Sequence, residues 1–151
     1  MSIFSSMNTT TSALTAQRLR MDVISSNIAN VDTTRAKQVN GEWEPYRRKS
    51  VTLTANEGKF SSFLNKAMGK REGVGNGVKV TKIQEDTETP FKLVYDPTHP
   101  DANEDGYVEM PNVDLLKEMV DLISASRSYE ANVTVLNANK AMLMKALEIG
   151  K

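Results

Sequence analysis

The sequence predicts an α+β fold in which long N- and C-terminal α-helices pair as a coiled-coil-like stalk, with a small antiparallel β domain inserted between them. Two observations support this prediction. Apolar residues recur at intervals of seven near both ends of the 151-residue chain, and helix-breaking residues are concentrated in its middle. All five prolines lie there, whereas residues 1–40 contain neither proline nor glycine. We therefore expect an N-terminal helix within 1–35, a β-rich domain over 36–111 and a C-terminal helix within 112–151.

The C-terminal segment is the strongest helix prediction in the chain. No proline or glycine interrupts it between Pro111 and Gly150, and Asn112 is suited to cap its start. One apolar row repeats strictly at seven and consists of Leu115, Leu122, Tyr129, Leu136 and Leu143. A second row, four positions after three of these residues, consists of Met119, Val133 and Leu147. Both rows fall on one side of the helix. A helix of about 37 residues is roughly 55 Å long, so it needs packing partners along its length.

A weaker apolar row predicts the N-terminal helix over residues 4–30. Met7, Leu14, Met21 and Ile28 repeat at seven, with Phe4, Ile24 and Val31 beside them. Many remaining positions are serine or threonine, whose helix propensity is poor, so we expect this helix to be stable only when it packs against a partner. Asn27 and Asn30 suit its C-terminal end, because asparagine tolerates the left-handed backbone conformation.

The middle of the chain predicts short strands joined by loops. Asn40-Gly41 indicates a turn, and strands are expected over 46–53, 78–83, 91–95 and 107–110. Residues 60–68 have the spacing of a short amphipathic helix, and 69–77 hold four glycines, typical of a flexible loop. We therefore expect a small antiparallel β unit with a flexible loop near 56–77.

Composition argues against several classes of function. Nineteen basic and nineteen acidic residues cancel, so there is no electrostatic reason to expect nucleic acid or an anionic membrane surface as a partner. No apolar run is long enough to span a bilayer, and the N-terminus lacks the basic and apolar regions of a cleaved signal peptide, so neither is expected. The chain has no cysteine, which rules out disulfides, thiol chemistry and cysteine-based metal sites.

Three motifs could carry chemistry, and each is incomplete. His99 is the only histidine, and it lies between two prolines with no supporting constellation for catalysis. The glycines of 73–77 lack the ending of a phosphate-binding loop. Residues 101–106 match the first half of a calcium loop, but its twelfth position is Asn112, where a bidentate glutamate is required. An Asx-rich turn is the better interpretation. We expect no catalytic residue, cofactor, metal or small-molecule substrate.

The two helical rows are weak for a self-sufficient bundle. Pairing of the termini as an intramolecular hairpin would bury both rows, but polar groups at Ser126, Tyr129 and Lys140 interrupt the C-terminal seam. Two marginal amphipathic helices at opposite ends of the chain favour a subunit that becomes ordered on assembly with neighbouring copies. The alternative is a soluble coiled-coil interaction or adaptor protein, which would form a defined homodimer.

Separated motifs resemble those of a known family of axial proteins. Residues 13–17 (Ala-Leu-Thr-Ala-Gln) and 25–34 (Ser-Ser-Asn-Ile-Ala-Asn-Val-Asp-Thr-Thr) resemble the N-terminal signature of flagellar rod and hook proteins. Residues 126–132 (Ser-Arg-Ser-Tyr-Glu-Ala-Asn) resemble their C-terminal signature. Central motifs resemble a proximal-rod member of the family, and they cover residues 95–102, 106–108 and 111–114.

The resemblance implies a structural, non-enzymatic subunit of the bacterial flagellar basal-body rod. Its terminal helices would pair in the inner core of the rod, and its β domain would face outward. Subunits would polymerise helically and transmit motor torque to the hook. The implied partners are other rod subunits, further copies of the chain and the flagellar type III export apparatus, which delivers such proteins to the periplasm and cell envelope without a cleaved signal peptide.

The same resemblance places the expected subunit interface on the two helices. Apolar residues should resist shear, and Asn27, Asn30, Glu130 and Asn132 should fix register, as single polar groups do in coiled coils. The expected interface residues, in chain order, are Met7, Leu14, Met21, Ile24, Asn27, Ile28, Asn30, Leu115, Leu122, Tyr129, Glu130, Asn132, Leu136 and Leu143.

Overall fold

The computed structural model describes residues 3–39, 41–56, 67–68 and 77–149. The chain divides into two compact units. The first unit comprises Met1–Leu19, Thr52–Lys82 and Ala125–Lys151, and the second comprises Arg20–Val51 and Ile83–Ser124.

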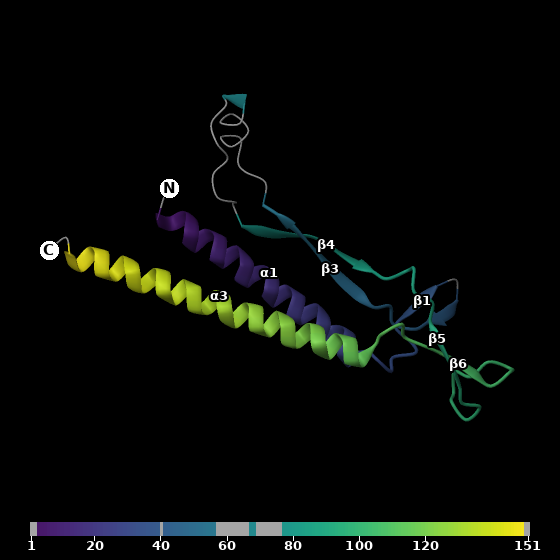
Figure 1. Ribbon diagram of the computed structural model, residues 1–151. Helices are drawn as coiled ribbons and strands as arrows, with labels where there is room; N and C mark the ends of the chain where they lie inside the picture. The colour runs from purple at the N-terminus through teal and green to yellow at the C-terminus, as the bar shows by residue number, and fades with distance from the viewer. Residues whose placement is uncertain (1–2, 40, 57–66, 69–76, 150–151) are drawn as a thin grey trace. The chain divides into compact units, whose positions relative to one another are not determined.

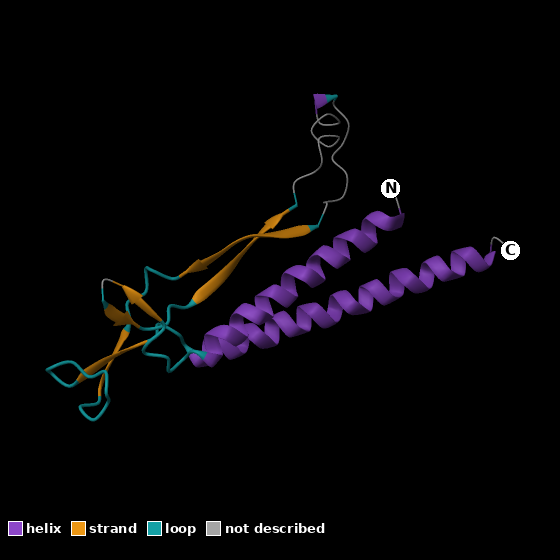
Figure 2. Ribbon diagram, turned by 180° about the vertical axis from the view of Figure 1, so that it is seen from behind, coloured by secondary structure: helices purple, strands orange, loops and turns teal. Residues whose placement is uncertain are grey.

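In the described part of the chain, two long helices and six strands make up the fold. Helix α1 (Ile3–Ala29) precedes the strands in sequence, and helix α3 (Leu115–Ile149) follows them (Figures 1 and 2). This confirms the α+β prediction. No helix in the described part of the chain combines the length and the apolar character needed to cross a membrane.

Side-chain hydroxyl groups of α1 bond to the backbone of the same helix. Four threonines donate to the backbone carbonyl four residues earlier, over 2.8 to 3.0 Å, and they are Thr9, Thr10, Thr11 and Thr15. The helix ends close to the expected position. The Nδ2 of Asn30 donates to the carbonyl of Ser26 at 2.8 Å and so satisfies an acceptor in the last turn.

The N-cap of α3 is Asp114, and the prediction of Asn112 was wrong. The Oδ1 of Asp114 accepts hydrogen bonds from the backbone nitrogens of Leu116 at 3.1 Å and Lys117 at 3.3 Å. Asn112 cannot serve as the cap because its side chain is buried and bonded to other segments.

The strands form three pairs. These are β1 (Lys37–Val39) with β2 (Glu42–Glu44), β3 (Lys49–Ala55) with β4 (Val78–Glu85), and β5 (Lys92–Tyr95) with β6 (Tyr107–Met110). The first and third pairs are antiparallel, with Gln38 opposite Trp43 in one and Val94 opposite Val108 in the other.

The strands agree with the predictions except near the start of the β region. Strands β4, β5 and β6 confirm three expected strands. Strand β3 begins three residues later than expected, because the backbone nitrogen of Arg48 donates to the side chain of Asn112 at 2.8 Å. The β1–β2 hairpin was not expected, although a turn was expected at Asn40-Gly41; Gly41 has a φ of 93°, and Asn40 lies outside the described residues. The helix expected over 60–68 and the loop expected over 69–77 lie almost wholly outside the described residues.

The most buried side chains of the two helices are small or polar. Glu118 and Ala125 of α3 are buried, and Leu122 between them is half-buried. A heptad seam takes its second row either three or four positions after the first. The structure buries the residues three positions after Leu115 and Leu122. Of the expected second row, four positions on, Met119 and Leu147 are exposed, so their place in the seam was wrong, whereas Val133 is half-buried.

Candidate subunit interface

A buried asparagine near the end of α1 anchors the second unit. The Nδ2 of Asn27 donates to the carbonyl of Lys49 at 2.8 Å and to Oε2 of Glu118 at 2.9 Å. Its Oδ1 accepts from the hydroxyl of Tyr46 at 3.0 Å and from the backbone nitrogen of Lys49 at 2.9 Å. The amide thus uses its full hydrogen-bonding capacity, and it ties α1 to the first turn of α3 and to the start of β3.

Glu118 is fully buried, and a basic residue compensates its charge. Arg48 donates from Nε to Oε1 of Glu118 at 2.6 Å. The Nη2 of Arg48 lies 3.7 Å from Asp121, which also pairs with Arg20 of α1 at 3.2 Å. Two guanidinium groups therefore face two carboxylates. Removing one partner from such a buried pair leaves the other charge desolvated and unpaired.

Asn112 links two further segments, the start of β3 and the loop after β4, to the start of α3. Its Oδ1 accepts from the backbone nitrogen of Arg48, and its Nδ2 donates to the carbonyls of Asp86 at 3.0 Å and Thr89 at 3.1 Å. We call Asn27, Tyr46, Arg48, Asn112 and Glu118 the polar cluster. These side chains hold α1, β3 and α3 in one arrangement within the second unit.

The residues that resembled half of a calcium loop form the expected Asx-rich turn. The Oδ1 of Asn103 accepts from the backbone nitrogens of Asp105 at 3.1 Å and Tyr107 at 2.8 Å. Asp101 accepts from Nε of Arg35 at 2.6 Å and from the hydroxyl of Thr34 at 2.8 Å. These hydrogen bonds, from Arg35 foremost, lower the pKa of Asp101 below its ordinary value.

His99 also serves as a turn residue. Its Nδ1 accepts a hydrogen bond from the backbone nitrogen of Asp101 at 3.1 Å. Among the described residues, no three histidine, cysteine, aspartate or glutamate side chains gather in a way that could hold a metal ion.

The expected interface residues differ in their accessibility. Ile24 and Asn27 are buried within the chain, whereas Leu115 and Glu130 are exposed. The others are half-buried: Met7, Leu14, Met21, Ile28, Asn30, Leu122, Tyr129, Asn132, Leu136 and Leu143. Two of the expected register residues are occupied locally, since the side-chain amides of Asn30 and Asn132 each donate to the carbonyl four residues earlier at 2.8 Å. That these residues contact neighbouring subunits stays a prediction.

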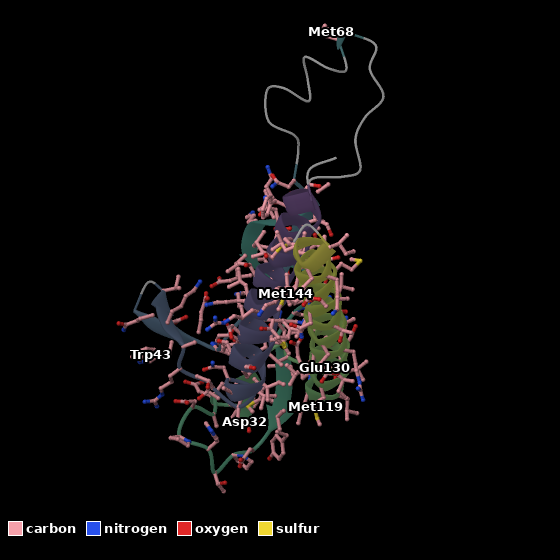
Figure 3. All side chains as sticks on the ribbon, turned by 90° about the vertical axis from the view of Figure 1, so that its left-hand side faces the viewer. Asp32, Trp43, Met68, Met119, Glu130 and Met144 are labelled. Carbon is pink, nitrogen blue, oxygen red and sulfur yellow. The ribbon has the colours of Figure 1, made fainter. Side chains whose placement is uncertain are left out.

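An exposed apolar row near the start of α3 was missed by the sequence analysis. Leu116, Met119, Val120 and Ile123 follow the i, i+3, i+4, i+7 spacing of one helix face, and Leu116 and Ile123 are 76% and 60% exposed. Figure 3 labels Met119 on this helix. We call these four residues the outer row. The spacing of these four residues could have revealed the outer row, but the prediction followed the apolar row that repeats at every seventh residue. An apolar helix face of this kind can bury itself only against another surface.

Comparisons with known proteins define the class to which this architecture belongs. The family model described as "Flagella basal body rod protein" matches residues 7–37, which include most of α1. The model described as "Flagellar basal body rod FlgEFG protein C-terminal" matches residues 104–149, which include β6 and α3. Both ends of the chain are therefore those of a flagellar rod-type axial protein, as the sequence motifs implied.

Full-length relatives narrow the class to one family. The chain is 68% identical to the flagellar basal-body rod protein FlgC of Bacillus subtilis, with the whole of both chains covered. It is 47% identical to FlgC of Borreliella burgdorferi, over 99% of this chain and 98% of the relative. It is 46% identical to FlgC of Escherichia coli O157:H7, over 93% and 92%. The chain belongs to the FlgC family of flagellar basal-body rod proteins. These matches do not favour the alternative of a soluble coiled-coil adaptor.

Proposed function

We propose that this chain is a proximal-rod subunit that polymerises through its terminal helices and transmits torque from the flagellar motor to the hook. The observation that supports this proposal is the outer row on α3. Four large apolar side chains remain exposed along one helix face and are not buried by the rest of the chain. Burial of such a row against a neighbouring subunit is favourable, since it removes apolar surface from water.

The polar cluster gives the outer row a defined orientation. Its hydrogen bonds fix the first turns of α3 within the second unit, so the exposed face is presented in one direction. A rigidly presented face loses little conformational freedom on binding. In this proposal Ile24 and Asn27 act inside the subunit, whereas Leu115, Glu130 and the half-buried residues of both helices contact neighbours.

A rod that transmits torque requires contacts between subunits that repeat along its axis without closing into a ring. Contacts between two different faces of neighbouring copies or of related rod subunits generate a helical filament when the rotation between subunits does not close into a ring. Apolar contacts along α3 would resist shear, and Asn30, Glu130 and Asn132 would fix register between subunits. We further propose delivery by the flagellar type III apparatus to a basal body in the cell envelope.

Site-specific cross-linking tests this function. Because the chain has no cysteine, a single introduced cysteine is a unique probe. We would place it at Ile123 and, as the matched control, at exposed Thr87 outside the helices. Basal bodies isolated from cells that express Ile123→Cys as their only copy should give a covalent adduct with a neighbouring rod subunit or a second copy when treated with a reagent that joins the introduced thiol to a nearby amine.

Two results would contradict the proposal. One is the absence of the Ile123→Cys protein from purified basal bodies of cells that swim normally. The other is an equal adduct yield at Ile123 and at Thr87, since random collision would then explain both.

A further inference from the structure

We propose that a cavity in the second unit binds an arginine side chain of a neighbouring protein subunit. The cavity has a volume of about 390 Å³. The β1–β2 hairpin and the β5–β6 hairpin supply most of its walls, and its lining includes Trp43, Tyr107, Glu42, Glu109 and Asp101. That the arginine belongs to another rod subunit rests on the proposed function, whereas the preference for a guanidinium group does not.

Two aromatic rings form part of the cavity wall. Trp43 of β2 and Tyr107 of β6 are 55% and 43% exposed, which is unusual for side chains of this size (Figure 3 labels Trp43). Tyr107 is held by an edge-on contact with Tyr95, whose ring centroid is 5.3 Å away. A cation placed over such a ring face is attracted by the ring quadrupole.

The charges around the cavity are acidic and partly uncompensated. Three of the nine lining residues are carboxylates, and none is lysine or arginine. Asp101 is neutralised by its pair with Arg35. Glu42 and Glu109 form no ion pair with any residue that the structure describes, so two of the acidic residues that line the cavity lack a cationic partner.

A second cavity in the same unit provides a contrast. It has a volume of about 410 Å³, and four of its lining residues are basic: Arg35, Lys37, Arg47 and Lys49. These groups already have partners within the chain. Lys37 lies within 4 Å of both Glu44 and Glu85, and Arg47 stacks over the ring of Phe91 at 4.3 Å. The basic cavity is internally satisfied, and the acidic, aromatic cavity is not.

Arginine matches the acidic cavity better than lysine does. The guanidinium group is planar, so it can stack on an indole ring while its edges donate to carboxylates. The ammonium group of lysine is a strongly hydrated point charge that loses more hydration on entering an aromatic site. The cavity therefore selects a cation that is flat, weakly hydrated and rich in donors.

Trp43 makes the test direct, because it is the only tryptophan in the chain and lines the cavity. Its fluorescence would be followed while the full chain is titrated with Nα-acetyl-arginine amide. We expect a saturable change with half-saturation of about 1 to 10 mM, as befits a single side chain. The neutral isostere Nα-acetyl-citrulline amide should bind at least ~5-fold more weakly, and the lysine analogue should lie between the two.

Paired variants identify the site. The double variant Glu42→Gln/Glu109→Gln should weaken arginine binding at least ~5-fold. The variant Glu104→Gln, at an exposed glutamate that does not line the cavity, should leave it unchanged. Far-ultraviolet circular dichroism checks that each variant is folded. The shift of the Trp43 indole proton in nuclear magnetic resonance spectra provides a second readout.

Equal binding of arginine and citrulline, full binding by the double variant, or no saturable response would each overturn the inference. The test is separate from that of rod function. Arginine binding by a chain that fails to cross-link in basal bodies would contradict the rod proposal and leave the cavity assignment in place. Cross-linking by a chain that does not bind arginine would support the rod proposal and contradict the cavity assignment.

Discussion

The guanidinium of Arg48 donates to Oε1 of Glu118 across 2.6 Å, and the other oxygen of Glu118 accepts from Asn27 at 2.9 Å. Each acceptor atom of this fully buried carboxylate therefore faces a donor. A glutamine cannot replace it. One end of a glutamine amide would accept from Arg48, but the other would point its hydrogens at the amide hydrogens of Asn27, whose Oδ1 is already occupied by Tyr46 and Lys49.

We accordingly expect Glu118→Gln to lower the free energy of unfolding by about 3 kcal/mol, despite its near-identical shape, because it breaks a buried charge pair and opposes two donors. Urea unfolding followed by Trp43 fluorescence measures this. The control is Glu130→Gln, which affects an exposed pair with Arg127 and should cost at most about 0.5 kcal/mol. Similar values for the two variants would show that the Arg48–Glu118 pair adds little to stability.

The side-chain amide of Asn112 is a second buried group that a near-isosteric residue should not be able to replace. In Asn112→Asp, a carboxylate oxygen would replace the Nδ2 group that donates to the carbonyls of Asp86 and Thr89, so acceptors would oppose acceptors. We expect a loss of about 2 to 3 kcal/mol in unfolding free energy, measured by the same urea titration. Asn137→Asp, at an exposed position of α3, should change it by less than about 0.5 kcal/mol.

A comparison of substitutions at Gly41 and Gly77 distinguishes the cost of backbone strain from the cost of steric overlap. Gly41 and Gly77 have nearly equal φ values of 93° and 94°. A Cβ on Gly41 would meet no atom within 4 Å, whereas on Gly77 it would overlap the Oγ of Ser12 and lie 3.3 Å from the Cα of Thr9. Thermal unfolding should show that Gly77→Ala costs at least about 1 kcal/mol more than Gly41→Ala.

Ser12 provides a check on that explanation. Its Oγ also accepts from the backbone nitrogen of Val78 at 3.1 Å, so Ser12→Ala alone should be destabilising. Combined with Gly77→Ala, it should recover part of the loss, because it removes the nearest clashing atom. Strict additivity of the two substitutions would contradict the clash.

The stability of the folded protein should depend on pH through Asp101. Its pKa in the folded protein is lowered by hydrogen bonds from Arg35 and then Thr34, so its contribution to stability is fully present above the unfolded value of about 3.9. That contribution is lost as the pH falls through the lower, folded pKa. Carbon-detected titration of the carboxyl group should give a midpoint below the ordinary one, and Arg35→Gln should move it upward.

Asp96 is the internal control for this titration. Its pKa is also lowered, but by hydrogen bonds from the side chain and backbone of Thr98. Arg35→Gln should therefore leave the midpoint of Asp96 in place. Parallel movement of both midpoints would indicate a general change in the loop and not the loss of one partner.

The outer row should be dispensable for folding and essential for assembly. Ile123→Asp places a charge on an exposed apolar position, so the free energy of unfolding should change by no more than about 0.5 kcal/mol. Swimming of cells that carry only this variant should be abolished, because the charge would be buried unpaired at a subunit contact. Normal swimming with a stably expressed variant would refute the role of this face.

The helices were predictable because their signals are local. Strict spacing and the absence of proline and glycine between Pro111 and Gly150 predict α3 without reference to any other segment. The polar cluster was not predictable in the same way. Glu118 reads as a dipole-stabilising residue of a first turn and Arg48 as part of a basic run, and only the meeting of three distant segments turns them into a buried pair.

The choice of seam failed for a related reason. Sequence reasoning assigns apolar side chains to the interior, so it selected Met119 over Glu118. The structure reverses this order because Glu118 has partners for both oxygens, which offset the cost of burying it. An acidic residue flanked by apolar ones can therefore be the interior position when an arginine and an asparagine lie within reach.

Helix α3 is also unequal along its length. Its first turns are bonded into the polar cluster, whereas from Lys140 to Ile149 every described position except Leu143 is exposed. A helix whose last turns are exposed frays from that end, so unwinding should begin at Ile149 and stop near Asn139, whose Nδ2 donates to the Oγ of Ser6 at 2.9 Å. Opening of the chain therefore has a direction: its C-terminal turns separate at low cost, while the segment around Asn27 stays closed until the whole unit unfolds.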